Sequence, residues 1–272
     1  MLMQEVPVTD KTFMDAEVPP TTETGMAETV AIHTRILRLA LSVEDSRVYW
    51  TQVDPTLPAS QRGKVAFEQR WFGGKSMERV RYLVTSFVPR YDAFPAAFDV
   101  LRRWTTMDLA TRQVICHWHL QLSDSIYRRF TGECLVSRRR LPEAKVDRDA
   151  ILRWVKNEFS DKWSEATYVQ FASKLLSAAV EAGLVSKRDH GLLLQPKVGD
   201  LALAYMLYLL RETRFQGSLS ENPYLGSVGL NMDALSQRAR SLPGVTVRRM
   251  MGLVEFDWGY PTLGAWAKEN IQ

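Results

Sequence analysis

The segment that decides the fold is residues 163–197, which read WSEATYVQFASKLLSAAVEAGLVSKRDHGLLLQPK. Its apolar residues recur at the three- and four-residue spacing of a helix as far as Ala179. Ser164 is placed to cap this helix, because its hydroxyl can accept a hydrogen bond from a free amide of the first turn. Gly183 follows the last apolar position, where a left-handed C-terminal cap favours glycine. The sequence therefore predicts a helix that begins after Ser164 and ends before Gly183.

A hairpin with a basic tip follows this helix. Two apolar runs, 184–185 and 192–194, flank the polar turn Ser-Lys-Arg-Asp-His-Gly, which ends in Gly191. Another helix is predicted before the capped one, at residues 149–159. Two helices followed by such a hairpin have the order of a winged helix-turn-helix. We therefore assign residues 146–198 to a winged helix-turn-helix-like module.

The outer face of the second helix and the tip of the hairpin form the first candidate nucleic-acid site. A helix fits the DNA major groove, where short polar and amide side chains meet base edges, whereas basic residues of a wing meet phosphates. Two alternatives remain open, namely a solvated helix beside a surface hairpin and a winged module that binds another protein. The candidate residues here are Thr167, Gln170, Ser173, Lys174, Lys187 and Arg188.

The composition is that of a folded protein with a sizeable core. The chain has 272 residues, of which 46% are hydrophobic and 24% charged. Its two cysteines, Cys116 and Cys134, make no disulfide framework and fit a reducing compartment. No apolar run reaches the roughly 18 residues of a membrane helix, and residues 1–26 lack the basic start and apolar stretch of a secretory signal. We expect a cytoplasmic protein that does not contact a membrane.

Charge is distributed unevenly along the chain. Residues 1–29 contain six acidic residues and one lysine, together with Pro19-Pro20 and few aromatic residues, which predicts a disordered acidic tail. The remaining residues have 34 basic and 25 acidic side chains, a net charge of +9. A basic body of this kind favours an anionic partner such as nucleic acid, although many soluble proteins are mildly basic without binding DNA.

A second basic region lies within residues 62–103, which hold nine basic and four acidic residues. Ser76 is placed to cap a helix there. The run Gly-Gly-Lys-Ser before this helix is similar to the end of a phosphate-binding loop, but Gln69 stands where that motif requires its first glycine. The region is either a second phosphate-contacting face or a solvated basic face that supports other helices. Its candidate contacts are Lys75, Arg79 and Arg81.

A third arginine cluster follows a long apolar helix that is predicted at residues 109–130. Arg138, Arg139 and Arg140 come after this helix, and cations near a helix C-terminus are also favoured by its dipole. Pro142 and the charged residues after it are predicted to be a linker into the winged module. We assign residues 30–145 to a helical N-terminal domain with a basic face.

A second hairpin is predicted near the C-terminus. Asn231 is placed to cap a helix, and the alternating runs 245–250 and 253–258 follow it. Residues 199–272 are therefore a C-terminal helical segment with a second β-hairpin, whose basic residues are Arg248 and Arg249. The fold class that emerges is mainly α, a multi-helix protein with winged helix-turn-helix-like modules and short β-hairpins.

The sequence contains no catalytic signature. Cys116, His117 and His119 are neighbours, but a metal site would need further ligands, and only Cys134 is close in sequence. We therefore expect these side chains to pack in the core beside Trp118 and predict no metal, no cofactor and no enzyme. The carboxylates are scattered over predicted surface faces, so none can be paired as acid and base.

Taken in order, the chain resembles the BrxA family of the BREX bacteriophage-defence systems over roughly residues 30–257. The resemblance is carried by short stretches of aromatic and apolar residues in helices and by the closing strand. These stretches are 47–50 (RVYW), 118–130, 163–167 (WSEAT), 183–184 (GL), 201–210 and 252–255 (GLVE).

The resemblance implies a small, mainly helical, non-enzymatic bacterial protein that binds nucleic acid beside the other BREX components. Double-stranded DNA is the expected partner, with RNA as an alternative. Two other functions stay open at this stage. One is a scaffold whose winged modules hold partner proteins of the defence complex, and the other is a winged-helix transcriptional regulator that prefers one operator.

Overall fold

The predicted pair of helices around the deciding segment forms where the sequence places it. α9 (Arg148–Glu158) is followed by α10 (Glu165–Glu181). The Ser164 hydroxyl accepts a hydrogen bond from the Thr167 amide at 3.4 Å, so the predicted cap is confirmed. α10 ends before Gly183, whose φ of 73° is in the left-handed region that favours glycine.

The predicted hairpin after α10 also forms, and it gains a third extended segment. Val185 and Leu193 make an antiparallel bridge, and Leu192 makes a second antiparallel bridge to Lys145. Lys145 lies in the stretch that the sequence assigned to a linker. The order of extended segment, α9, α10 and hairpin is therefore that of a winged helix, with a wing at residues 186–191.

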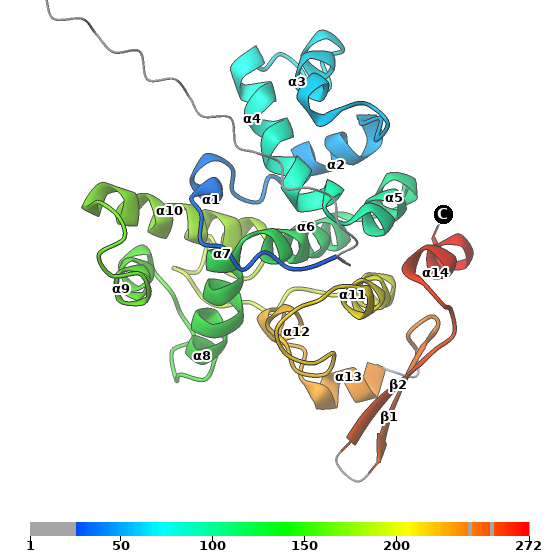
Figure 1. Cartoon of the computed structure of the whole chain (residues 1–272). Coiled ribbons are helices and arrows are strands. Elements are labelled where there is room, and N and C mark those ends of the chain that lie inside the picture. Colours follow the sequence, from blue (N-terminus) through cyan, green and yellow to red (C-terminus); the bar gives the residue numbers. More distant parts are fainter. Residues whose placement is uncertain (1–25, 239–240, 251–252, 272) are drawn as a thin grey trace, which may run out of the picture.

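The computed structural model describes residues 26–238, 241–250 and 253–271 and is mainly helical, as predicted (Figure 1). Residues 1–25 of the predicted acidic tail lie outside the described residues. The other elements are α1 (Arg35–Arg38), α2 (Val43–Gln52), α3 (Ala59–Glu68), α4 (Met77–Phe87), η1 (Val88–Asp92), α5 (Pro95–Arg103), α6 (Leu109–Ser123), α7 (Ser125–Arg129), η2 (Phe130–Cys134), α8 (Leu135–Arg139), α11 (Asp200–Glu212), α12 (Pro223–Ser227), α13 (Met232–Arg238), β1 (Val245–Met250), β2 (Leu253–Trp258) and α14 (Leu263–Asn270).

Two apolar helices form the centre of the molecule. Residues 114–123 of α6 and 202–210 of α11 are all buried, as expected for helices that are largely apolar on every side. Figure 1 shows α6 and α11 between the other helices. A hydrophobic cluster from Ile36 to Ala267 includes residues of the predicted N-terminal, winged and C-terminal parts. None of the described helices is long and apolar enough to cross a membrane.

The long helix predicted at residues 109–130 is interrupted, which corrects that prediction. α6 ends at Ser123 and α7 begins at Ser125, because Asp124 is extended and caps α7 by accepting the Tyr127 amide at 2.9 Å. The apolar periodicity continues through this break, so periodicity alone did not reveal it.

The C-terminal hairpin is confirmed. β1 and β2 are antiparallel, with Val247 opposite Phe256. The Trp258 ring packs against Tyr208 of α11, with ring centroids 4.8 Å apart. The Tyr208 hydroxyl donates to the Gly244 carbonyl at 2.6 Å, which ties the start of the hairpin to the central helix.

Residues 26–29 do not belong to a free tail, which corrects the predicted boundary at residue 29. Ala27 bridges to Arg214 in parallel, and the Thr29 amide donates to the Leu122 carbonyl at 2.8 Å. The cause is Glu28, which is 8% exposed and forms an ion pair with Arg128 at 3.3 Å. A buried partner for one acidic residue thus draws the chain onto the helices.

The wing depends on Gly191, and we expect Gly191→Ala to lower the free energy of unfolding by about 1–3 kcal/mol. A Cβ at this position would lie 2.1 Å from the Val146 carbonyl oxygen, and φ is 79°. Urea unfolding measures the change. Gly73→Ala is the matched control, because φ is 72° there and a Cβ would meet nothing within 4 Å. Equal losses for the two variants would show that the contact with Val146 does not matter.

The histidines beside Trp118 are core residues, as expected from the sequence. His117 contacts the Tyr127 hydroxyl at 2.9 Å and the Ser227 hydroxyl at 2.8 Å. His119 contacts the Arg90 carbonyl at 3.0 Å and the Tyr205 hydroxyl at 2.6 Å. Both rings are fully buried and lie in hydrogen-bonded networks that join α6 to α7, α11 and α12.

Because His117 is buried, we expect the free energy of unfolding to fall as the pH becomes acidic. Burial lowers the pKa of His117 to about 3, with the Arg139 charge as a smaller cause, against an ordinary value near 6.5. Above about pH 6.5 the ring is neutral in both states. Below it the unfolded chain takes up a proton that the folded chain does not, so the free energy of unfolding falls by up to about 1.4 kcal/mol per pH unit.

We therefore expect wild type to lose about 2 kcal/mol more than His117→Gln when urea unfolding is compared at pH 6.5 and pH 5. Ser177→Ala, at an exposed position of α10 that does not titrate, is the control and should keep the wild-type dependence. Identical pH dependence in wild type and His117→Gln would contradict the assignment.

Candidate nucleic-acid interface

The candidate residues of α10 lie on the side of the helix that faces away from the core. Gln170 is exposed, whereas Thr167, Ser173 and Lys174 are half-buried. The Ser173 hydroxyl donates to the Val169 carbonyl at 3.0 Å, so its proton is used inside the helix. Thr167 and Gln170 lie in the N-terminal half of α10, which is the part of a recognition helix that contacts base edges, and Lys174 lies one turn further on. The Thr167 hydroxyl is hydrogen-bonded to the Ser164 hydroxyl at 3.0 Å, so the Gln170 amide is the exposed polar group of this half.

The tip of the wing holds Lys187 and Arg188 in solvent. Ser186 organises this turn, because its hydroxyl accepts the Arg188 amide at 3.2 Å and the Asp189 amide at 3.0 Å. The same hydroxyl donates to the Asp189 carboxylate at 2.7 Å. Within the part of the chain that the structure describes, the two basic side chains make no hydrogen bond or ion pair. Both are therefore available to phosphates.

The three arginines after η2 differ in their surroundings. Arg139 donates to the carbonyls of Ser227 at 2.6 Å and Leu194 at 3.1 Å, and its burial lowers the pKa of its guanidinium. Arg138 donates to the Lys145 carbonyl at 3.3 Å. These two side chains hold α8 to the wing and to α12. Only Arg140, which is exposed, is available for an external contact.

The basic face of α4 is also partly used inside the protein. Lys75 forms an ion pair with Asp45 of α2 at 3.1 Å, so it joins two helices. Arg79 and Arg81 are exposed on α4, and the predicted Ser76 cap is present. Figure 1 shows α4 in a different part of the molecule from α9 and α10. The second basic region is therefore separate from the wing.

Two basic residues that the sequence analysis did not select connect these regions. Arg35 and Arg38 are exposed on α1, which packs against α10. The Arg38 guanidinium lies over the exposed Tyr82 ring of α4, 5.8 Å from its centroid. Basic side chains thus extend from α10 across α1 to α4. Their outward spacing was visible in the sequence, but their position beside α10 is a result of tertiary packing.

The C-terminal hairpin contributes less charge than the sequence suggests. Arg248 forms an ion pair with Asp257 on the facing strand at 3.0 Å, and both side chains are more than half exposed. Salt bridges of this kind are weak and screened, yet the pair neutralises the arginine locally. The Arg249 side chain lies outside the described residues.

A groove of about 1180 Å³ lies beside the base of the wing. It is lined by residues of α7, α8 and α12 and by the loops around α12. Arg129 and Arg140 are on one wall, and Val30 of the N-terminal strap (residues 26–34) is at its edge. Arg129 is engaged with Glu158 and lies 3.9 Å from Glu133.

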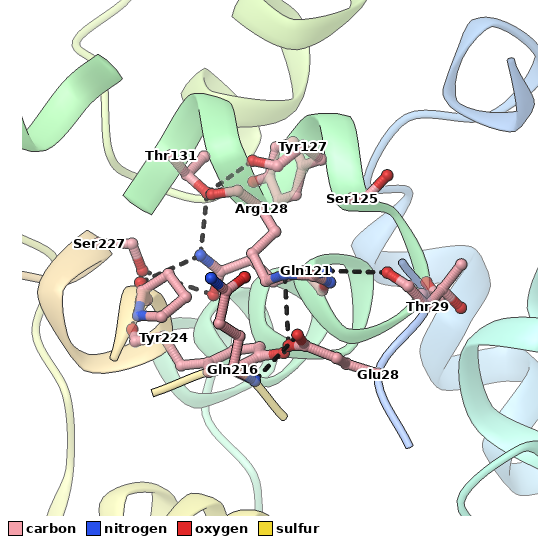
Figure 2. Close-up of polar contacts among 12 residues, drawn as sticks. Glu28, Thr29, Gln121, Ser125, Tyr127, Arg128, Thr131, Gln216, Tyr224 and Ser227 are labelled. Atoms are coloured by element: carbon pink, nitrogen blue, oxygen red, sulfur yellow. Dashed lines mark hydrogen bonds and ion pairs between the residues drawn. The ribbon is translucent and has the colours of Figure 1, made fainter. Parts of the chain in front are cut away.

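The N-terminal strap is fixed by a buried ion pair at the edge of this groove (Figure 2). Glu28 accepts hydrogen bonds from the Tyr224 hydroxyl and from the Gln216 amide, the latter at 3.1 Å. Arg128 donates to the carbonyls of Gln121 at 2.6 Å and Thr29 at 2.8 Å. Every charged oxygen and most guanidinium donors are therefore paired, so this network is structural and offers no free charge to a ligand.

The residues that could supply other chemistry are dispersed or buried. Within residues 26–238, 241–250 and 253–271, no group of three or more His, Cys, Asp or Glu side chains is placed to hold a metal ion. Burial raises the pKa of the Cys116 thiol to about 11, so this thiol is protonated at neutral pH.

The comparisons with known proteins add no functional assignment. Neither the models of known protein families nor the functionally curated proteins give a match to this sequence. A structural match is found to an uncharacterized protein from Magnetospirillum magneticum, with a TM-score of 0.48 and 14% sequence identity. The match covers 66% of this chain and 97% of that one.

Proposed function

We propose that this protein is a non-enzymatic, double-stranded DNA-binding component of a BREX-type phage-defence system. The observation that carries the DNA-binding part is the winged unit. Its helix α10 presents Gln170 and Lys174 next to a wing whose Lys187 and Arg188 are free in solvent. A helix and a wing in this order match a major groove and the phosphates beside it.

Binding of this kind relies mainly on phosphate neutralisation. The exposed polar side chains of α10 are few, whereas the exposed basic residues of the wing, of α1 and of α4 are many. Phosphate contacts position a protein on DNA without reading its sequence. We therefore expect similar affinity for unrelated duplexes and a steep dependence on salt.

The first test is fluorescence anisotropy of the full chain with a random-sequence duplex of about 30 base pairs, at low and near-physiological salt. Affinity that falls steeply with salt supports the proposal, and the slope estimates the number of neutralised phosphates. A failure to bind even at low salt would remove it. Preference for one sequence by thousands-fold would instead point to an operator-binding regulator.

The phage-defence part of the proposal rests on the family resemblance. It is tested by deleting the gene for this protein from a host with an active BREX system and measuring the efficiency of phage plating. We expect the deletion to abolish protection and the wild-type gene to restore it. If a gene carrying Lys187→Ala/Arg188→Ala does not restore protection, defence depends on the wing. Full protection without the chain would contradict this role.

A protein scaffold is the second candidate, and one observation favours it. Leu192 and Leu194, in the second arm of the hairpin, and Leu141, before the winged unit, are 37%, 37% and 52% exposed, so large apolar side chains are in solvent here. Co-purification with other defence components after nuclease treatment would support the scaffold. If nuclease treatment removed every partner, the proteins would co-purify only because they bind the same DNA, and the scaffold function would be contradicted.

A further inference from the structure

We infer that His33 and Asp124 share one proton at neutral pH, and that this proton holds the end of the N-terminal strap and the start of α1 against the break between α6 and α7. Neither side chain belongs to the proposed DNA-binding face, so this pH-dependent attachment is independent of the proposed function. Three features lead to it, namely the surroundings of the two ring nitrogens, the burial of the carboxylate and the charges around the pair.

Both ring nitrogens of His33 face oxygen atoms. Nε2 lies 3.0 Å from the Ser123 carbonyl oxygen, which can only accept a hydrogen bond, so Nε2 carries a hydrogen. Nδ1 lies 3.5 Å from Oδ2 of Asp124, and neither of these two atoms has a hydrogen-bond partner among the described residues. A neutral ring would therefore turn a lone pair toward a carboxylate. One further proton removes this repulsion, either on Nδ1 as an imidazolium or on Oδ2 as a carboxylic acid.

The Asp124 carboxylate is fixed in position and shielded from water. Its other oxygen, Oδ1, accepts the Tyr127 amide at 2.9 Å and thereby caps α7. The carboxylate side chain is 1% exposed, and the His33 side chain is 15% exposed. The cavity beside the pair has a volume of about 10 Å³, which is too small for more than one water molecule. A carboxylate in this position is costly unless a proton or a cation neutralises it.

The charges around the pair do not replace this proton. Burial raises the pKa of the Asp124 carboxyl, and the positive charges of His33 and Arg90 offset only part of that rise. Arg90 of η1 donates to two backbone carbonyls that follow α1, and Arg35 of α1 lines the same cavity but is exposed. The residues of α4 and α6 that line the cavity are uncharged. Tyr127 of α7 stays neutral because burial raises its pKa well above the ordinary value.

The attachment stabilises the fold only while the proton is present. In an unfolded chain an Asp carboxyl titrates near about pH 4 and a His ring near about pH 6.5, so at pH 8 these side chains hold almost no proton. The folded pair still holds one. Because the folded state then binds more protons, the free energy of unfolding falls as the pH rises above about 6.5, until the proton leaves the folded pair. This dependence has the opposite sign to that of His117.

The test replaces the carboxylate by an amide. Asp124→Asn keeps a cap for α7 and can donate its own hydrogen to Nδ1 of His33, so no shared proton is needed. Asp147→Asn is the matched control, because Asp147 also caps a helix, accepting the Ala150 amide at 2.6 Å, but is exposed. Urea unfolding of the full chain is compared at pH 6.5 and pH 8.5. We expect the unfolding equilibrium constants of wild type and Asp147→Asn to rise about threefold to tenfold more than that of Asp124→Asn.

His33→Gln removes the ring itself and decides the outcome if Asp124→Asn does not fold. It should show the same weaker pH dependence. Hydrogen exchange of the Leu37 amide, which donates to the Thr34 carbonyl at 3.0 Å, reports on the attachment of α1. After correction for the intrinsic rate, its opening should increase about threefold or more between these pH values in wild type and stay constant in the variants of the pair. Equal pH dependence of unfolding in wild type and both variants of the pair would overturn the inference, as would Leu37 opening that does not change with pH in wild type.

Discussion

Replacing Arg128 by methionine is expected to lower the free energy of unfolding by about 3–5 kcal/mol. Arg128 and Glu28 are both nearly buried, and the substitution leaves the Glu28 carboxylate away from water without its cation. The carbonyls of Gln121 and Thr29 also lose their donors. Urea unfolding at neutral pH measures the loss.

The double variant Glu28→Gln/Arg128→Met separates the ion pair from packing. Removing both charges should recover most of the loss, because the main cost of the single variant is an uncompensated buried charge. Arg140→Met, at an exposed arginine 12 positions along, is the control and should stay within about 0.5 kcal/mol of wild type. A single variant as stable as wild type would show that the strap contributes nothing to the fold.

Replacing Lys174, Lys187 and Arg188 together by alanine is expected to weaken duplex binding by about 10- to 100-fold at low salt. If each of the three side chains neutralises one phosphate, the slope of affinity against salt should fall by about 3. The loss should be the same for unrelated duplex sequences. The Lys187 and Arg188 side chains make no described hydrogen bond or ion pair, and alanine keeps the Arg188 amide that donates to Ser186, so the substitutions should leave the wing folded.

A matched control removes three exposed basic residues elsewhere. Lys64, Arg103 and Lys268 lie on α3, α5 and α14, and the triple alanine variant has the same net charge as the test variant. It should bind duplex with nearly wild-type affinity. If both triple variants lose affinity equally, only net charge matters. If neither does, the assigned face is wrong, and Arg35, Arg38, Arg79 and Arg81 become the residues to test.

The proposed DNA-binding face contains only some of the basic residues that the sequence analysis selected. Lys75, Arg139 and Arg248 each have a partner in the folded chain. An arginine that already donates to buried carbonyls cannot turn to a phosphate without breaking those bonds and leaving polar groups unsatisfied. The proposed DNA-binding face therefore rests on the cations that remain in solvent.

Local signals in the sequence were sufficient for most elements of the winged unit. The Ser164 cap, the left-handed Gly183 and the apolar spacing between them depend on residues within one or two turns of each other. The same holds for the Asn231 cap and for the alternation that predicts β1 and β2. Short-range hydrogen bonding and side-chain periodicity carry this information, so it can be read without a structure.

The sequence by itself thus determined the helical class, both hairpins, the helix caps at Ser76, Ser164 and Asn231, and the burial of His117 and His119. Only the tertiary structure decided which charges are free. Glu28 meets Arg128 across 100 positions, Arg139 meets Ser227 across 88, and α1 brings Arg35 and Arg38 beside α10. The physical reason is that a charged side chain is satisfied by whichever partner the packing of distant helices brings near. Local sequence patterns do not indicate which distant residue will be the partner.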